Sequence, residues 1–195
     1  MAQTGKIMLD TNYAAIVLAA GRSTRFGGPK LSAMLDGAPV LSHALRSAMA
    51  APATRRVLVT RDDHCAEGFE TVQVDNDALS ASLRAGLAAI DGCAGAFIFL
   101  GDMPRIPADV PCLLAAAIGD GLAAYPVFQD RPGHPLLLAA RGFALAQGLA
   151  GDRGLGALLH DHPDVVRVPV DQAGVVSDVD TPDDLARMQS AGSGT

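Results

Sequence analysis

The chain has 195 residues, which is enough for one α/β domain and too few for two. Hydrophobic residues make up 49% of the sequence and charged residues 18%, a balance that excludes a disordered chain. The formal charge of −6 and the aromatic content of 4% argue against nucleic-acid binding, which needs a basic face or base-stacking rings.

The N-terminal segment and the cysteines bear on where the protein works. Residues 1–13 lack the apolar core of a signal peptide, and the apolar run Ala14–Ala20 is too short to span a bilayer. The three cysteines have no metal-ligand spacing and are expected to be packing residues: Cys65, Cys93 and Cys112. We therefore expect a cytoplasmic protein that does not bind membranes.

Short apolar runs alternate with longer helical patterns along the chain. The runs predict buried strands at Ala14–Ala20, Arg56–Thr60, Ala96–Leu100, Leu122–Val127 and Val165–Val170. The patterns between them predict helices at Val40–Ala50, Ser80–Ile90, Ala108–Ile118 and Gly154–His160. Pro135–Leu138 predicts a further strand, which could be antiparallel.

This alternation predicts an α/β fold with a single doubly wound, mainly parallel sheet and helices on both faces. We place the domain at residues 14–189, after an N-terminal extension (1–13) and before a frayed tail (190–195). Ligands of such sheets bind beyond the C-terminal ends of the strands, which directs attention to the loops there.

The loop after the first predicted strand concentrates glycine and positive charge. Arg22, Arg25 and Lys30 place three of the 15 lysines and arginines in one short segment of an acidic protein. Glycines let backbone N–H groups approach an anion, arginine binds phosphate through two hydrogen bonds, and lysine adds a mobile charge. The loop therefore predicts a triphosphate ligand, although it is neither a Walker A loop nor a dinucleotide fingerprint.

The segment Leu18–Lys30 resembles the LAAGxSxRxG…K motif of the MobA-like nucleotidyltransferases. This family includes molybdopterin cytidylyl- and guanylyltransferases, and its fold is the Rossmann-like nucleotide-diphospho-sugar transferase type. The resemblance implies that the backbone of Leu18, Ala19, Ala20 and Gly21 receives the base and ribose. It further implies that the phosphates are held by Arg22, Arg25 and Lys30.

Asp102 follows a predicted strand in the turn Gly101-Asp102-Met103-Pro104. A carboxylate at this place suits a Mg²⁺ ion that also binds phosphate oxygens, although it could instead be a turn residue. The turn resembles the family's GDxP motif, which implies that Asp102 is a metal ligand. Met103 departs from the glutamine that cytidylyltransferases often have.

A second acidic group lies at residues 177–185. Thr181 as N-cap, Pro182 as first helical residue and Asp184 three residues after the cap predict a helix start, which leaves Asp184 without a chemical role. The segment resembles the family's D-I-D-T-P-E-D-L element, which completes the metal site. We favour Asp180 as that ligand and keep Asp178 as a further candidate.

Three further segments resemble parts of the same family. Ser80–Leu87 resembles the cytidylyltransferase S-S-S-L-R-A-G-L element, so Ser82 is expected to bind the nucleotide or cap a helix, and Asn76 in the shortened loop before it is another candidate. His134 lies in a G-H-P element and is expected to be exposed and to contact the acceptor. The turn at 151–154 resembles a G-D-x-G turn near the acceptor.

Together these features predict a Mg²⁺-dependent nucleotidyltransferase that transfers CMP from CTP to the phosphate of the molybdenum pterin cofactor. Arg22, Lys30 and Asp102 are the expected catalytic residues, and the product could pass to a molybdoenzyme or its chaperone. The alternatives are a GTP-, sugar-phosphate- or polyol-phosphate-specific relative, an oxidoreductase, or a non-catalytic cofactor-binding protein. The remaining histidines, His43, His64, His160 and His162, have no partner pattern that indicates a function.

Overall fold

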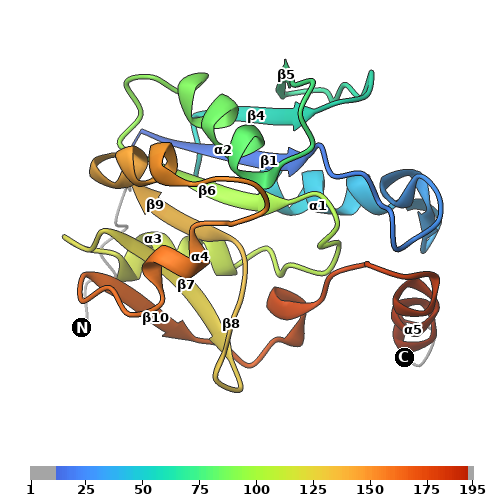
Figure 1. Cartoon of the computed structure of the whole chain (residues 1–195). Coiled ribbons are helices and arrows are strands. Elements are labelled where there is room, and N and C mark those ends of the chain that lie inside the picture. Colours follow the sequence, from blue (N-terminus) through green and yellow to red (C-terminus); the bar gives the residue numbers. More distant parts are fainter. Residues whose placement is uncertain (1–11, 193–195) are drawn as a thin grey trace.

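The computed structural model describes residues 12–192 and has a central eight-stranded sheet (Figure 1). Its strands run in the order β10-β7-β9-β6-β1-β4-β5, and β8 pairs with β7. The strands are β1 Tyr13–Ala19, β4 Arg55–Thr60, β5 Glu70–Gln73, β6 Gly95–Leu100, β7 Ala123–Phe128, β8 Arg131–Pro132, β9 Leu136–Ala139 and β10 Val165–Pro169. The sheet is mainly parallel, because β9 is antiparallel to β6 and β7, and β8 to β7, while the other pairs are parallel.

Helices cover both faces of this sheet, as the alternation of elements predicts (Figure 1). Successive residues of β1 point to opposite faces, so Ala15 and Val17 join one core and Ala14 and Ile16 the other. The first core includes residues of α1 (Val40–Met49) and α3 (Val110–Ala117). The second includes residues of α2 (Leu79–Ala88), the 3₁₀ helix η2 (Ala140–Gly148) and α4 (Gly156–Leu159).

A smaller core attaches the C-terminal helix α5 (Pro182–Gly192) beside the main sheet (Figure 1). Leu185 and Met188 of α5 pack against buried Leu35 and Val40, and Phe26 from the loop after β1 joins them. This region also contains β2 (Met34–Leu35), β3 (Ala38–Pro39) and the 3₁₀ helix η1 (Lys30–Ser32), and a further 3₁₀ helix, η3 (Ala173–Val176), precedes α5. The small core therefore ties the basic loop to the segment that contains Asp180.

The structure departs from the expected elements in several places. The predicted helix at Gly154–His160 is reduced to the four residues of α4, and the sequence did not predict β2, β3, β5 or β8. Helix α5 continues to Gly192, so residues 190–192 are helical rather than a frayed tail, and residues 193–195 lie outside the described part. Strand β1 begins at Tyr13, within the predicted extension, whose residues 1–11 also lie outside it.

Cys93 is buried, as a packing residue should be, but Cys65 and Cys112 are exposed, so the packing role predicted for these two is wrong. Within residues 12–192, none of the helices combines the length and the apolar character that a membrane crossing requires.

Candidate active site

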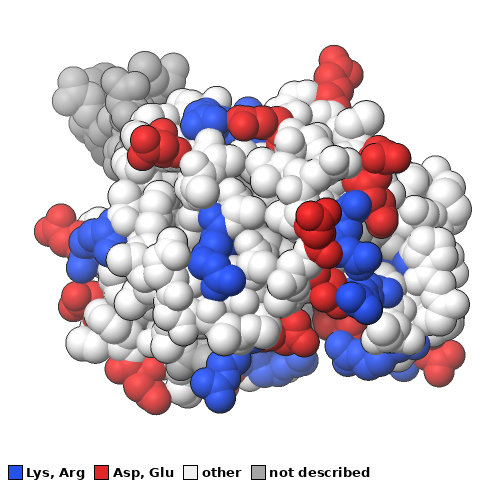
Figure 2. All heavy atoms as spheres, turned by 45° about the horizontal axis from the view of Figure 1, so that its top comes forward, with Lys and Arg blue, Asp and Glu red and all other residues white. Residues whose placement is uncertain are grey.

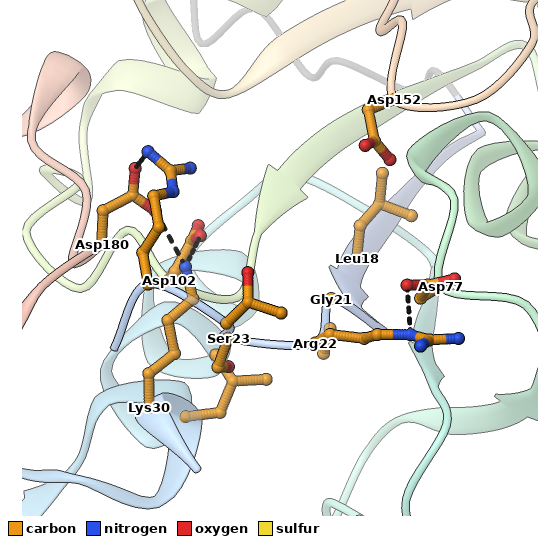
Figure 3. Close-up of a pocket in the computed structure, with 13 residues that line it drawn as sticks. Leu18, Gly21, Arg22, Ser23, Lys30, Asp77, Asp102, Asp152 and Asp180 are labelled. Carbon is orange, nitrogen blue, oxygen red and sulfur yellow. Dashed lines mark hydrogen bonds and ion pairs between the residues drawn. The ribbon is translucent and has the colours of Figure 1, made fainter. Parts of the chain in front are cut away.

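The basic loop, the β6 turn and the segment before α5 meet around one cavity of about 280 Å³ (Figure 3). Its lining carries most of the predicted phosphate and metal residues: Leu18, Ala19, Gly21, Arg22, Ser23, Thr24, Arg25, Lys30, Leu31, Asp77, Asp102, Asp152 and Asp180. A neighbouring cavity of about 240 Å³ is lined in part by the same residues and reaches Ala20, Leu79, Ser82 and Leu100. We call these the phosphate cavity and the nucleoside cavity.

Glycine at position 101 brings Asp102 to the end of β1. The backbone N–H of Gly101 donates to the Leu18 carbonyl at 2.9 Å. A Cβ atom at this position would lie 3.2 Å from both the Leu18 carbonyl oxygen and the Ala19 Cβ, which is tighter than ordinary packing. A larger residue would push the turn away from β1, so the close approach that positions Asp102 depends on glycine.

Lys30 joins two carboxylates inside the phosphate cavity (Figure 3). Its Nζ lies 2.7 Å from Asp102 Oδ2 and 3.1 Å from Asp180 Oδ1, and only 11% of the Lys30 side chain is exposed. Burial alone lowers the pKa of Lys30, but the charges and hydrogen bonds of Asp102 and Asp180 outweigh it and raise the pKa above its usual value. Lys30 therefore stays protonated and places a positive charge between two negative ones.

The two arginines of the loop also face carboxylates. Arg25 Nη1 lies 2.7 Å from Asp180 Oδ2, and Arg22 pairs with Asp77 on the other side of the cavity (Figure 3). The arginine side chains are 74% and 60% exposed, so solvent weakens both pairs. Such exposed arginines can exchange a carboxylate for a phosphate at low cost. Acidic and basic side chains also lie side by side toward the right of the surface in Figure 2.

Asp180 is held in place by hydrogen bonds of the residues before and after it in the chain. The backbone N–H of Val179 donates to the Asp102 carbonyl at 2.9 Å, and the Val179 side chain is fully buried. Beyond Asp180, the Thr181 and Asp184 side chains bond to each other's backbone N–H groups at 3.2 and 2.7 Å, which is the capping box that the sequence predicts. The Asp184 carboxylate also accepts from the Asp180 N–H at 3.1 Å.

Asp178 does not line the phosphate cavity. Desolvation, together with the negative charges of Asp180 and Asp102, raises the pKa of its carboxyl group. The residue therefore lies near the other two acids but outside the cavity that they line. Among residues 12–192, no group of three or more acidic, histidine or cysteine side chains is arranged to hold a metal ion. The geometry thus brings together two of the three predicted ligands and leaves Asp178 outside.

Asp102 and Asp180 nevertheless fit a magnesium ion. Their oxygens converge on one point, the position of Lys30 Nζ, and carboxylate oxygens are ligands that Mg²⁺ prefers. Magnesium is commonly held by one or two carboxylates, with water and substrate phosphates completing the octahedron. The pair would therefore suffice as the protein's share of such a site.

All but one of the predicted nucleotide-binding residues line the phosphate or the nucleoside cavity. The exception is Asn76, whose Oδ1 accepts a hydrogen bond from the Ala78 N–H at 2.8 Å and thereby shapes the turn before α2. Ser82 lies within the first turn of α2 rather than at its cap, and its hydroxyl donates to the Ala78 carbonyl at 3.3 Å. The expected capping role of Ser82 is therefore wrong.

The sequence did not single out two acidic residues that line both cavities, Asp77 and Asp152. Asp77 directly follows Asn76, so the sequence singled out this loop but not the side chain that lines the cavities. Asp152 belongs to the turn at 151–154, whose place is fixed because the Ser80 N–H donates to the Gly151 carbonyl at 3.1 Å. Contacts between such distant segments leave no local pattern in the sequence.

His134 is half-buried, which corrects the expectation of an exposed side chain. Its Nδ1 lies 3.3 Å from the Ile98 carbonyl oxygen, and burial lowers the pKa of the imidazole, an effect that this hydrogen bond and the charge of Asp102 partly oppose. His134 lines neither the phosphate nor the nucleoside cavity but borders two further cavities along the same edge of the sheet.

The basic loop, the carboxylates of Asp102 and Asp180, and the sheet order agree with a match between residues 15–166 and the MobA-like NTP transferase domain. The chain belongs to this family. The family assignment confirms the resemblance of the Leu18–Lys30 loop, and the nucleotide-diphospho-sugar transferase-like fold agrees with it.

The relatives that match this chain are named for different activities. The chain is 37% identical over 127 residues to the bifunctional protein GlmU of Leifsonia xyli, covering 60% of this chain but only 26% of that protein. It is 27% identical over 181 residues to the molybdenum cofactor cytidylyltransferase of Escherichia coli, covering 87% and 92% of the two chains. The chain thus spans about a quarter of the first relative and most of the second.

Among solved structures, Rv0371c of Mycobacterium tuberculosis superposes with a TM-score of 0.83 at 29% identity, covering 92% of this chain and 99% of that one. Rv0371c has also been crystallised in complex with manganese. A divalent metal in such a close structural relative agrees with the fit of Asp102 and Asp180 to a hard cation.

Proposed function

We propose that this protein transfers CMP from CTP to the phosphate of a molybdopterin-type acceptor and releases pyrophosphate. The observation that carries the proposal is the convergence of Lys30, Asp102 and Asp180 beside Arg25, with Arg22 on the other side of the same cavity. A triphosphate and its metal need such an alternation of positive and negative groups at the end of a parallel sheet.

Each group of residues has a distinct task in this proposal. The backbone of Leu18–Gly21 and the start of α2 enclose the nucleoside, while Arg22, Arg25 and Lys30 bind the phosphates and stabilise charge on the leaving pyrophosphate. Asp102 and Asp180 would hold Mg²⁺, which supplies charge neutralisation at the phosphates when bound. The acceptor phosphate is already ionised, so positioning suffices and no general base is assigned.

Two observations support cytidine as the base and a pterin as the acceptor. The E. coli cytidylyltransferase matches over nearly its whole length, and Ser82, from the segment that resembles that branch, lines the nucleoside cavity. The product could then be handed to a molybdoenzyme or its chaperone.

The proposal is tested by measuring pyrophosphate release with Mg²⁺, molybdopterin and each of the four NTPs. We expect kcat/KM for CTP to exceed that for GTP about ten-fold or more, because a mismatched base leaves buried polar groups unpaired. Asp102→Asn should lower kcat by about 100-fold or more while CTP binding persists through the loop. GTP equal to or better than CTP would reject the cytidylyl assignment alone.

If pyrophosphate release with every NTP did not exceed the rate without the protein, the transferase activity would be rejected. If the nucleotides still raised the melting temperature, a protein that binds cofactor without turnover would be supported instead.

A further inference from the structure

A cavity of about 360 Å³ lies between β7, β8, the start of β9 and α4, away from the metal carboxylates. Its lining consists of Tyr125, Pro132, Gly133, His134, Leu136, Gly156 and His160. The volume lies within the roughly 300–1000 Å³ that small-molecule sites occupy. We call it the distal cavity.

The distal cavity adjoins the nucleoside cavity through a narrow apolar passage. A space of about 90 Å³ shares His134, Leu136 and Gly156 with the distal cavity. The same space shares Leu18, Leu79 and Leu100 with the nucleoside cavity. One molecule with a charged end and an uncharged end can therefore reach from the phosphates to the distal cavity.

Charge is distributed unevenly along this path. The phosphate cavity is lined by three cations and four carboxylates, whereas no aspartate, glutamate, lysine or arginine of residues 12–192 lines the distal cavity. Tyr125, Pro132 and Leu136 give it largely apolar walls. An ionised phosphate is favoured at the first end and an uncharged ring system at the second, because burying an unpaired charge is costly.

His134 adds one directional polar group to the distal cavity. The Ile98 carbonyl can only accept, so the His134 Nδ1 that lies 3.3 Å from it must carry the hydrogen. Burial lowers the pKa of His134, so the ring is neutral near pH 7 and its Nε2 has a lone pair. Within residues 12–192, the only buried side-chain nitrogen or oxygen without a hydrogen bond is Arg56 Nε, so the unpaired His134 Nε2 is accessible from outside.

We propose that the distal cavity binds the ring system of the acceptor, a planar nitrogen heterocycle, and that His134 Nε2 accepts a hydrogen bond from one of its N–H groups. This inference rests on the proposed transfer to a pterin phosphate and identifies which part of the chain selects the pterin. A sugar or polyol phosphate fits less well, because apolar walls would leave most of its hydroxyls without partners.

Gly156 offers a way to fill the distal cavity without disturbing the fold. A Cβ atom at Gly156 would meet no atom within 4 Å, and the residue lines both the distal cavity and the passage. Gly156→Leu therefore places an apolar side chain at the cavity wall. Gly148 in η2 also has no atom within 4 Å of an added Cβ but lines neither space, so Gly148→Leu is a matched control.

The probe is 6-hydroxymethylpterin phosphate, titrated by its fluorescence in the presence of Mg²⁺ and a non-hydrolysable CTP analogue. We expect Gly156→Leu and His134→Phe to raise the Kd of the pterin about ten-fold, whereas Gly148→Leu leaves it unchanged. The Kd of the CTP analogue, measured separately, should stay the same in all variants, which also shows that they are folded.

Glucose 1-phosphate serves as the competing acceptor class. Binding of glucose 1-phosphate in preference to the pterin by the wild-type protein would overturn the inference, and so would pterin binding that neither Gly156→Leu nor His134→Phe weakens. Wild-type protein that binds the CTP analogue but not the pterin would overturn it too while leaving nucleotidyl transfer intact. Failure to bind any NTP would reject the proposed function itself.

Discussion

Lys30 occupies the point on which the two proposed metal ligands converge. Its ammonium group contacts Asp102 at 2.7 Å and Asp180 at 3.1 Å, and both carboxylates also hold its proton in place by raising its pKa. A divalent cation and this ammonium group cannot share the same position. Binding of a metal ion there would therefore require Lys30 to move, and the phosphates of the proposed nucleotide would give it an alternative partner.

This competition leads to a prediction for Lys30→Ala. In the absence of nucleotide, the variant should bind Mn²⁺ several-fold more tightly than the wild type, because the carboxylates lose their internal counterion. With nucleotide present, the same variant should bind CTP more weakly, because a phosphate contact is lost. Free Mn²⁺ is measured by its EPR signal, and CTP binding by calorimetry.

Arg22→Ala is the matched control for this prediction. Arg22 pairs with Asp77 rather than with the metal carboxylates, so its loss should weaken CTP binding but leave Mn²⁺ affinity unchanged. A Lys30→Ala protein whose Mn²⁺ affinity is equal to or below that of the wild type would show that the ammonium group does not compete with metal.

At the residue scale, the sequence predicted which charged residues line the site better than which partners they contact. Arg22, Arg25 and Lys30 were identifiable because they share one loop with glycines, and Asp102 because it follows a buried strand. The pairing of each cation with a particular carboxylate depends on segments 55 to 155 residues away, which no local pattern reveals. The metal role of Asp178 and the nucleotide role of Asn76 stay predictions, because neither residue lines the phosphate or the nucleoside cavity and Asn76 Oδ1 accepts from the Ala78 N–H.

At the scale of elements, α5 begins with a reciprocal cap that also positions the site. The Thr181 hydroxyl and the Asp184 carboxylate lie 2.7 Å apart, and the carboxylate accepts from the Asp180 N–H. The hydrogen bonds from Thr181, the largest effect, lower the pKa of Asp184 and keep it ionised. The helix start and the orientation of Asp180 are therefore coupled.

We predict that Thr181→Ala lowers the free energy of unfolding by about 1 kcal/mol, the usual cost of a lost N-cap. Urea denaturation measures this change. Ser190→Ala, in the same helix, is the control, since its exposed hydroxyl bonds only to the Ala186 carbonyl within that helix and its loss should cost less than about 0.5 kcal/mol. Equal stability of the two variants would mean that the cap does not contribute.

Elements with a strong hydrophobic pattern were predicted from the sequence, and elements without one were not. Strands β1, β4 and β6 are buried hydrophobic runs, and their predicted bounds hold to within one residue. Strand β5 has the polar sequence Glu-Thr-Val-Gln and lies at the sheet edge, so neither hydrophobicity nor length marks it. Helix α4 is short because Gly154 and Gly156 disfavour helix at its start.

Across the whole molecule, the C-terminal edge of the sheet forms one path from charged to uncharged surroundings. The phosphate cavity, the nucleoside cavity, the passage and the distal cavity each share residues with the next. Strand β9 runs antiparallel between β6 and β7, so its start, rather than its end, lies at this edge. That reversal brings His134 and Leu136 to the same edge as Asp102.

The burial of His134 at this edge should make the stability of the whole protein depend on pH. An imidazole in the unfolded chain titrates near 6.5, whereas burial, the dominant cause, lowers the pKa of His134 in the folded state. Below about pH 6.5 the unfolded state therefore binds more protons, and the free energy of unfolding falls as the pH falls. Asp178 contributes with the opposite sign, because its raised carboxyl pKa makes the free energy of unfolding rise as the pH falls. Lys30 changes the pH dependence of stability only in the alkaline range.

We predict that the urea midpoint of the wild-type protein falls between about pH 7.5 and about pH 5.5, and that His134→Gln reduces this fall. Comparing how steeply the urea midpoint changes with pH in the wild type and in the variant separates the effect of His134 from that of Asp178, because the variant retains Asp178 and its opposite contribution. His160→Gln, which removes a 66% exposed imidazole bordering the same cavity, controls for the loss of a histidine as such and should keep the wild-type slope. If His134→Gln has the same pH dependence as the wild type, His134 is not held neutral by burial, and its Nε2 could not serve as the hydrogen-bond acceptor of the distal cavity.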